Sequence, residues 1–263
     1  MSRTAMPVIS SRFLRIWHRN FAVYRKTWKV SFMPPLLEPL LYLAAFGLGM
    51  SALVGDVSWR NRSASYIVFI APALLSVNMM YNSFFETTYG SYVRMYYQKT
   101  FDAMMATPLF LEEIITGEII WGATKSVIAS SIMLTIISLF GLIRYPEGVL
   151  LIPLSFLAGF AFASIGMYFT AAVRNIDLFN LPIFLFITPM FLFGGTFFPL
   201  DTLPGWAQAL AWFLPLTHLV EITRAIAIGP LDGFALWNLL YLILFSAIFF
   251  PLALVKMRKR LIK

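Results

Sequence analysis

The chain has 263 residues, of which 60% are hydrophobic and only 12% are charged, and its mean hydropathy is +0.79. Soluble domains carry roughly a quarter charged residues, so this composition indicates an integral membrane protein. The net charge of +8 is explained by Lys and Arg retained on the cytoplasmic side of a membrane, and no nucleic-acid partner is expected. The absence of cysteine excludes disulfides, thiol catalysis and cysteine-based metal sites.

Residues 1–33 are predicted to form a cytoplasmic segment ahead of the membrane domain. From about residue 9 to residue 30, aromatic and apolar residues recur at spacings of three and four, with basic residues between them. This pattern predicts an amphipathic helix lying along the lipid headgroups. Such a helix either only anchors the chain or also contacts a cytoplasmic partner. The residues assigned to this interfacial helix are Arg15, Trp17, Arg19, Arg25, Lys26 and Trp28.

Residues 34–263 are predicted to form one all-α membrane domain with six transmembrane helices. A span needs about 20 residues to cross about 30 Å of hydrocarbon. The apolar segments that meet this length lie near 34–54, 65–86, 114–142, 149–173, 178–198 and 233–256. Seven basic residues precede the first segment and five follow the last, so the positive-inside rule predicts that both termini are cytoplasmic.

A polar stretch at 97–113 interrupts the apolar segments on the predicted cytoplasmic side. Lys99, Asp102, Glu112 and Glu113 supply its charge, and proline at 108 is expected to end a short helix over 97–108. Phe101, Met104 and Met105 give this helix an apolar side. The stretch is either an ordinary loop or a helix that docks into a groove of another protein.

A second unusual segment, at 199–224, lies on the predicted outer side. Proline residues at 199, 204 and 215 divide it into short helices, because proline ends helices but is tolerated in their first turn. Trp206 and Trp212 are typical of a membrane interface. These helices can enter the bilayer only if their free backbone groups are buried in protein or line a wet cavity.

Four ionisable residues lie in or at the ends of the spans: Glu38, Glu86, Glu118 and Lys125. Ionisable groups in a membrane are costly and indicate function by default. Glu118 and Lys125 are seven residues apart, so they share a helix face and could join one polar cluster. A structural set of paired charges near the cytoplasmic interface and a functional site both remain open. No acidic residue clearly occupies the middle of a span, which disfavours a proton relay.

The two histidines, His18 and His218, lie on opposite sides of the predicted topology, so a shared metal or catalytic site is improbable. A hydrogen-bonding role within the external segment is expected for His218. No P-loop occurs, because GATKS at 122–126 lacks the Gly-Lys-Ser/Thr order and lies within an apolar helix.

Several spaced motifs, in order, resemble those of ABC-2 type permeases, the membrane subunits of ATP-binding cassette exporters. They are EPLLYLAAFGLG at 38–49, FETTYGSYVRMYYQKTFDAMMATPL at 85–109, GEIIWGATK at 117–125 and FPLDTLPGWAQALAWFLPLTHLVEITR at 198–224. The resemblance covers nearly the whole chain and is greatest to the nodulation-type permeases that export lipo-chitooligosaccharides. Related permeases also export drugs and polysaccharides.

The resemblance implies roles for three segments. The helix at 97–108 would be the coupling helix moved by the ATPase, with Tyr97, Gln98, Lys99, Thr100, Phe101, Asp102, Met104 and Met105. The interfacial helix would also lie near the ATPase. The helices at 199–224 would close the outer end of the pathway, with Pro199, Trp206, Trp212, Pro215, His218 and Glu221.

The resemblance also implies a working unit of two copies of this chain and two ATPase subunits in a bacterial inner membrane. ATP and Mg²⁺ would be bound by the ATPase, and this chain would hold neither a cofactor nor catalytic residues. The expected cargo is amphipathic, such as a lipo-oligosaccharide, a glycolipid or a polysaccharide.

Other functions predict other features. A drug efflux permease would belong to the same family. An ion-driven secondary transporter would show an inverted repeat and helices broken at mid-membrane, and neither is visible. A membrane-embedded enzyme would need clustered catalytic residues. On the fifth span, the residues that could line a lateral opening, or face lipid or a second copy, are Phe184, Phe186, Met190, Phe191 and Phe193.

Overall fold

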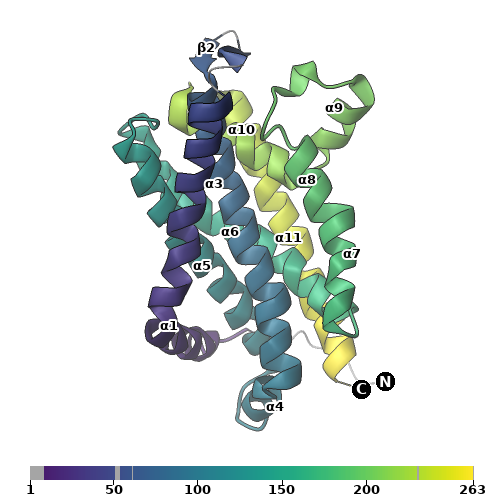
Figure 1. The fold of residues 1–263 in the computed structure, drawn as a ribbon. Coiled ribbons are helices and arrows are strands. Elements are labelled where there is room, and N and C mark those ends of the chain that lie inside the picture. The colour runs from purple at the N-terminus through teal and green to yellow at the C-terminus, as the bar shows by residue number, and fades with distance from the viewer. Residues whose placement is uncertain (1–8, 51–53, 61, 230, 263) are drawn as a thin grey trace.

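Helices dominate the structure because a segment inside a bilayer must satisfy its backbone hydrogen bonds internally. The computed structural model describes residues 9–50, 54–60, 62–229 and 231–262 (Figure 1). The main helices and strands are α1 (Phe13–Tyr42), β1 (Asp56–Trp59), β2 (Arg62–Ser65), α3 (Tyr66–Phe85), α4 (Thr100–Met105), α5 (Leu111–Leu139), α6 (Leu151–Ala172), α7 (Asn180–Pro182), α8 (Thr188–Phe193), α9 (Gly205–Trp212), α10 (Pro215–Ile228) and α11 (Gly233–Leu261). Shorter π-helical segments are Leu43–Met50, Glu86–Gly90, Val93–Tyr97 and Ile183–Ile187, and 3₁₀ turns are Glu147–Leu150, Ile176–Phe179 and Leu200–Thr202.

The prediction of an all-α membrane domain is confirmed for the described residues, where six helical segments are long and apolar enough to span a bilayer. They are Phe13–Gly47, Tyr66–Tyr97, Leu111–Leu139, Glu147–Ala172, Ile176–Phe193 and Gly233–Leu261. The second span does not end at Glu86 as predicted, because π-helical turns continue it to Tyr97. Residues 51–53, at the predicted end of the first span, and residues 1–8 lie outside the described residues.

α3 lies at the centre of the bundle and packs against α5, α6 and α10. Small residues let these helices approach closely, as is common between membrane helices. At Gly159 on α6, an added Cβ would lie 2.6 Å from the Cβ of Ser126 and 2.9 Å from the Cα of Ala123 on α5. Glycine is therefore required at this crossing, since any side chain would push the two backbones apart.

α1 combines the predicted interfacial helix and the first span in one helix. Its N-terminal turns, the darkest purple in Figure 1, lie across one end of the bundle, and its later turns run along the bundle. The arrangement agrees with a helix lying along a membrane surface. The predicted boundary at residue 33 is not a break, because the helical backbone continues from Phe13 to Tyr42.

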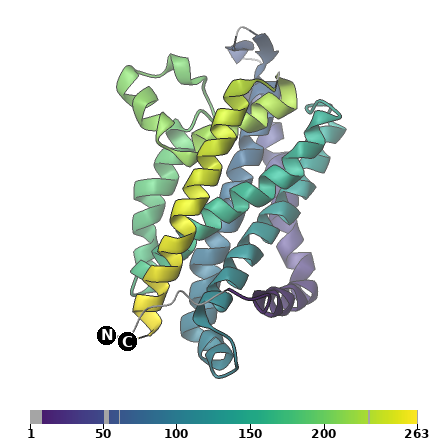
Figure 2. The same ribbon diagram turned by 180° about the vertical axis from the view of Figure 1, so that it is seen from behind.

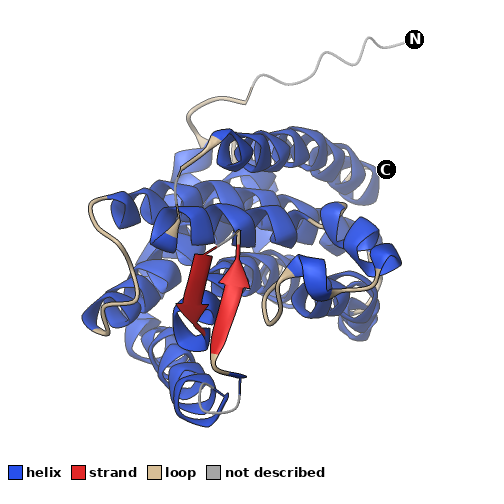
Figure 3. Ribbon diagram, turned by 90° about the horizontal axis from the view of Figure 1, so that it is seen from above, coloured by secondary structure: helices blue, strands red, loops and turns tan. Residues whose placement is uncertain are grey.

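A short antiparallel hairpin, β1–β2, was not predicted. It pairs Asp56 with Ser65 and Trp59 with Arg62, and Figure 3 shows it across one end of the bundle. The alternation of exposed and buried residues in β1 places Val57 and Trp59 toward the protein. Four residues are too few for a hydropathy pattern to distinguish this strand from a loop.

The two ends of the bundle carry different elements. α4, the first turns of α1 and the C-terminal end of α11 lie together at one end, and the hairpin and α9 lie at the other (Figures 1 and 2). The segment that resembles a coupling helix is therefore separated from the segment that resembles an outer gate by the length of the bundle.

Candidate functional site

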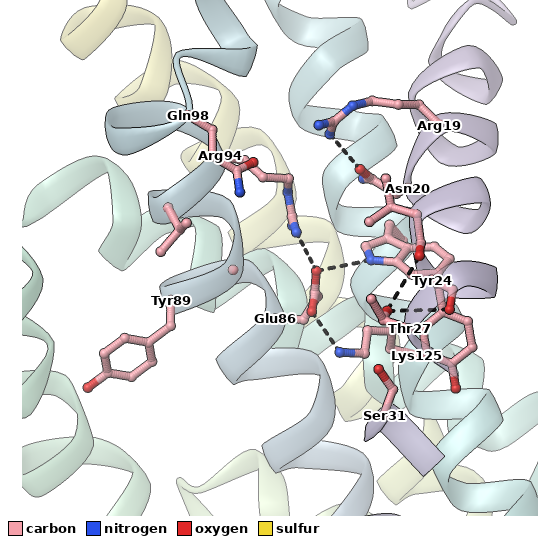
Figure 4. Close-up of a pocket in the computed structure, with 14 residues that line it drawn as sticks. Arg19, Asn20, Tyr24, Thr27, Ser31, Glu86, Tyr89, Arg94, Gln98 and Lys125 are labelled. Atoms are coloured by element: carbon pink, nitrogen blue, oxygen red, sulfur yellow. Dashed lines mark hydrogen bonds and ion pairs between the residues drawn. The ribbon is translucent and has the colours of Figure 1, made fainter. Parts of the chain in front are cut away.

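A cluster of charged side chains joins the second and third spans at the α4 end of the bundle. Glu86, just after α3, accepts hydrogen bonds from Lys125 Nζ at 2.8 Å and Trp121 Nε1 at 3.0 Å, both on α5. Arg94 Nη1 lies 2.8 Å from Glu86 Oε1, the carboxylate oxygen that also accepts from Trp121 (Figure 4). Both carboxylate oxygens of Glu86 are thus held by cations.

Arg94 connects this pair to a second, fully buried carboxylate. Glu118 Oε2 accepts from Arg94 Nη2 at 2.6 Å and Nε at 2.9 Å, and from Ser91 Oγ at 2.7 Å. Its other oxygen accepts from Asn20 Nδ2 of α1 at 2.8 Å. The cluster therefore links three segments, α1, the end of the second span and α5, through charge-assisted bonds, which are stronger than neutral ones.

The structure confirms that Glu118 and Lys125 belong to one polar cluster, although each pairs with a different partner. Glu86 joins them, and Glu38 lies beside the cluster in a pocket of about 350 Å³ that Glu86 and Lys125 also line. Sequence reasoning did not single out Arg94, because this residue follows the predicted end of the second span at residue 86. The overlooked signal is the spacing of Glu86 and Arg94 on a helix that continues beyond the apolar segment.

A polar pocket of about 390 Å³ lies between α1 and this cluster. Figure 4 shows side chains from α1, from the end of the second span and from α5 around it. Its polar and charged lining residues are Arg19, Asn20, Tyr24, Thr27, Ser31, Glu86, Tyr89, Arg94, Gln98 and Lys125.

The first turns of α1 dock firmly on α5 along one face. Ile16 is buried against Gly117, where an added Cβ would lie 2.6 Å from Ile16 Cβ, and Trp17 Nε1 donates to Thr124 Oγ1 at 2.9 Å. The other predicted interfacial residues face outward or stand at the edge of the contact. Arg15, Arg25, Lys26 and Trp28 are exposed, and Arg19 is half-buried.

α4 is shorter than the predicted helix at 97–108. Lys99 has a left-handed backbone (φ 53°), which a right-handed helix cannot contain, so the preceding helix ends at Tyr97 and α4 begins at Thr100. Phe101 is completely buried in this chain's own core, so it anchors α4 from within rather than docking on a partner. Met104 and Met105 are half-buried, and the exposed members are Tyr97, Gln98, Lys99 and Asp102.

At the opposite end, α9 and α10 form a helix pair bent by 86°. Pro204 precedes α9 and Pro215 is the first residue of α10, as the proline pattern predicted. α9 is amphipathic, with Trp206 66% exposed, whereas residues 215–227 of α10 are buried in the bundle. α10 therefore enters the bundle. Pro199 precedes the short turn Leu200–Thr202, and Trp212 ends α9 and contacts the His218 ring.

Two polar side chains hold α10 in place. His218 Nδ1 lies 2.6 Å from Asn238 Oδ1 of α11 and Nε2 lies 3.0 Å from the carbonyl oxygen of Trp212, which gives this histidine the predicted hydrogen-bonding role. Glu221 accepts from Trp59 Nε1 at 3.3 Å and pairs with the hairpin's Arg60 at 3.2 Å. The hairpin thus fastens onto α10.

Arg224 occupies an unexpected position, since it ends the segment at 199–224 that the sequence places on the outer side. It is fully buried on α10, where Nε donates to the Phe69 carbonyl and Nη2 to the Thr196 carbonyl, both at 3.1 Å. Its guanidinium also lies 3.6 Å from the centre of the Phe69 ring. These contacts replace the water that a loop arginine would have.

The six helices that can span a bilayer define a class, the multi-pass membrane protein. Residues 11–228 match the family described as ABC-2 type transporter, and the chain belongs to this family. It is similar to Nodulation protein J of Rhizobium leguminosarum bv. trifolii, at 36% identity over 87% of this chain and 86% of that protein. Nodulation protein J of Rhizobium leguminosarum bv. viciae is 30% identical over the full length of both. The inner membrane transport permease YadH of Escherichia coli K12 is 23% identical over 78% of each chain.

The chain is accordingly the transport component of an ABC transporter, a multi-pass bacterial membrane protein from a family whose members pair with an ABC ATPase subunit.

Proposed function

We propose that this chain exports an amphipathic glycan, such as a lipo-oligosaccharide or a glycolipid, as a pair of copies driven by two ATPase subunits. The observation that carries the proposal is the position of α4. It is exposed at one end of the bundle, follows the second span directly and lies next to the charged cluster around Arg94. ATP and Mg²⁺ are held by the ATPase subunits, and this chain supplies the pathway.

In this proposal, motion of the ATPase reaches the membrane domain through α4. Phe101 fixes α4 to the core, and Arg94 bonds both Glu86 and Glu118. A displacement of α4 therefore moves α1 and α5 together with the second span. At the far end, α9 and α10 close the outer side of the pathway until the spans separate.

The proposed orientation has both termini and α4 in the cytoplasm of a bacterium and α9 in the periplasm. The excess of basic residues before the first span and after the last supports this assignment. A cysteine at an exposed position of α4, such as Asp102→Cys, reacts with a membrane-impermeant thiol reagent only in inverted vesicles if the orientation is as proposed. Labelling in intact cells contradicts it.

A second copy is proposed to pack on the exposed apolar faces of the first and fifth spans. Leu41 is 68% exposed, and Phe184 and Leu185 are 68% and 76% exposed, whereas Met190 of the same span is buried in this chain's own core. Met190 therefore does not line a lateral opening. Because the chain lacks cysteine, a single cysteine placed at Leu41, Phe184 or Leu185 is expected to cross-link the two copies without competing thiols.

The coupling proposal is tested in proteoliposomes that contain the permease and its ATPase subunit. Asp102→Arg changes only the exposed face of α4, so we expect normal assembly of the membrane domain with loss of ATP-driven export. Phe101→Ala removes a buried ring and is expected to destabilise the fold by about 3–5 kcal/mol. Unchanged export in Asp102→Arg means that α4 does not transmit motion from the ATPase.

The cargo is tested in the same vesicles by offering a lipo-oligosaccharide and an amphipathic drug in parallel. Transport of the glycan with ATP supports the proposal, and transport of the drug alone favours the efflux alternative. Uptake driven by a proton gradient without the ATPase contradicts both. The relatives named Nodulation protein J support the glycan assignment through the family resemblance.

A further inference from the structure

The pocket between α1 and the charged cluster carries more positive than negative charge. Three cations line it, Arg19, Arg94 and Lys125, and among the described residues Glu86 is the only carboxylate in its lining. Glu86 is already bonded by Arg94 and Lys125. Glu118, behind this lining, is bonded by Arg94 and is linked to Arg19 only through the side chain of Asn20, so the cluster has two carboxylates for three cations.

Arg19 is the third of these cations. Its guanidinium donates to two neutral acceptors, Asn20 Oδ1 at 2.9 Å and Thr100 Oγ1 at 3.4 Å. None of the ion pairs in the described part of the chain includes it. A half-buried arginine with neutral partners retains donors and charge for a planar, oxygen-rich anion, because its fork of N–H groups suits phosphate.

Neutral donors complete the lining. Hydroxyl groups of Tyr24, Thr27 and Ser31 and the amide of Gln98 surround the same space, and Figure 4 shows the α1 members along one wall. Hydroxyl and amide groups are the usual partners of phosphate and glycerol oxygens. The volume of about 390 Å³ accommodates a phosphodiester headgroup.

The pocket also lies where such headgroups are. Its outer wall is the amphipathic part of α1, whose exposed tryptophan Trp28 and basic residues Arg25 and Lys26 are typical of a helix at the lipid interface. Basic pockets between membrane helices on the cytoplasmic side are suited to anionic lipid headgroups.

We propose that this pocket binds the phosphate of an anionic phospholipid, with Arg19 as the main contact. The leaflet depends on the proposed orientation of the transporter. Since Arg19 also contacts Thr100, the first residue of α4, and Gln98 lines the pocket, a bound headgroup fastens α1 to the segment that receives motion from the ATPase. The lipid is then a structural partner of the coupling region.

The experiment measures lipid binding to the purified full-length chain by native mass spectrometry, with phosphatidylglycerol and with phosphatidylcholine. We expect phosphatidylglycerol to bind at least about tenfold more tightly than phosphatidylcholine. Arg19→Gln should weaken phosphatidylglycerol binding about fivefold, the contribution of one basic residue near an anionic surface. Arg25→Gln is the matched control, an exposed arginine of the same helix outside the pocket, and should change binding less than twofold.

A second variant adds charge without removing a buried contact. Thr27→Glu places a carboxylate in the pocket wall and should weaken phosphatidylglycerol binding, whereas Ala22→Glu, exposed on the same helix outside the pocket, should not. Equal binding of the two lipids overturns the proposal, as do equal losses in Arg19→Gln and Arg25→Gln. Displacement of the lipid by inorganic phosphate at about 10 mM also overturns it, because the site then takes a soluble anion.

The measurement needs neither ATP nor the ATPase. A chain that binds phosphatidylglycerol as expected but exports no glycan contradicts only the proposed function, and the reverse result contradicts only the lipid site.

Discussion

Removal of the Glu118 carboxylate tests the role of the charged cluster as the joint between α1, the second span and α5. Glu118→Ala deletes the acceptor of Asn20, Ser91 and Arg94 in a site with no solvent exposure. Breaking a buried pair by removing one partner costs about 3–5 kcal/mol, because the remaining charge is left uncompensated. Arg94 keeps Glu86, so we expect the lower end of this range, about 3 kcal/mol.

The assay is unfolding of the purified chain in mixed micelles, followed by tryptophan fluorescence. Glu147→Ala is the matched control, since Glu147 pairs with Arg144 at 3.2 Å and Arg144, which is 57% exposed, stays solvated when the carboxylate is removed. Exposed pairs contribute about 0–1 kcal/mol, so this variant should unfold close to the wild type. The double variant Glu118→Ala/Arg94→Met should lose less than the sum of the single variants, because the two side chains share one interaction.

Unfolding of Glu118→Ala and Glu147→Ala at the same denaturant concentration would contradict the role of the cluster as a buried joint. That result would mean that water enters the cluster and solvates Arg94, so that the cluster is not a buried joint. If the losses of unfolding free energy in the two single variants add up in the double variant, the destabilisation does not arise from the Glu118–Arg94 bond.

Three further predictions concern packing, the outer end and pH. Gly159→Ala should destabilise the bundle by about 2 kcal/mol, because the new methyl group overlaps the α5 backbone. His218→Ala should cost about 2 kcal/mol, since it leaves the buried Asn238 amide oxygen without its partner, as measured by thermal unfolding. Asp232→Asn should lower the melting temperature at pH 7, because the amide of Ala235 and then Arg60 hold the pKa of Asp232 below its ordinary value.

The pH prediction has a definite sign. Because the pKa of Asp232 is lowered in the folded protein, ionised Asp232 stabilises the fold at any pH above 3.8, its ordinary pKa. This stabilisation is lost as the pH falls through the lower pKa of the folded state. The difference between Asp232→Asn and the wild type should therefore be constant from pH 7 to pH 5 and shrink below about pH 4. A difference that instead grows on acidification contradicts the assignment.

The packing and histidine predictions have matched controls. Gly205→Ala, in α9, should leave stability unchanged because nothing lies within 4 Å of the new methyl group. His18→Ala removes an exposed histidine and should stay within about 0.5 kcal/mol of the wild type. If Gly205→Ala loses as much stability as Gly159→Ala, or His18→Ala as much as His218→Ala, the loss does not arise from the contacts described.

The sequence predicts most residues of the charged cluster, but not Arg94 at its centre. Glu86, Glu118 and Lys125 are conspicuous because charges are rare in apolar segments. Arg94 could not be predicted from hydropathy, because hydropathy shows which part of a helix can lie in lipid. It does not show whether the helix continues past the apolar segment. Only the course of the second span to Tyr97 brings Arg94 between the two carboxylates.

The same distinction applies to Phe101 and Arg224. The sequence places Phe101 in a polar interruption and Arg224 in the outer segment at 199–224, yet both are fully buried. Burial depends on which neighbouring elements fold over a residue, and neither α4 nor α10 has a length or period that predicts those neighbours. The predicted docking role of Phe101 is therefore wrong, because the apolar side of α4 that carries Phe101 faces this chain's own core.

By itself, the sequence determined that this protein lies in a membrane, that six of its segments are long and apolar enough to span the bilayer, and where proline divides its outer segment. These properties follow from hydrophobic transfer and backbone hydrogen bonding, which act locally along the chain. The tertiary structure alone decided that the hairpin holds α10, that Arg94 joins two carboxylates and that Arg19 lines a pocket without an ion-pair partner among the described residues. Such pairings join residues far apart in the chain, and their energies depend on distance and burial, which no local pattern encodes.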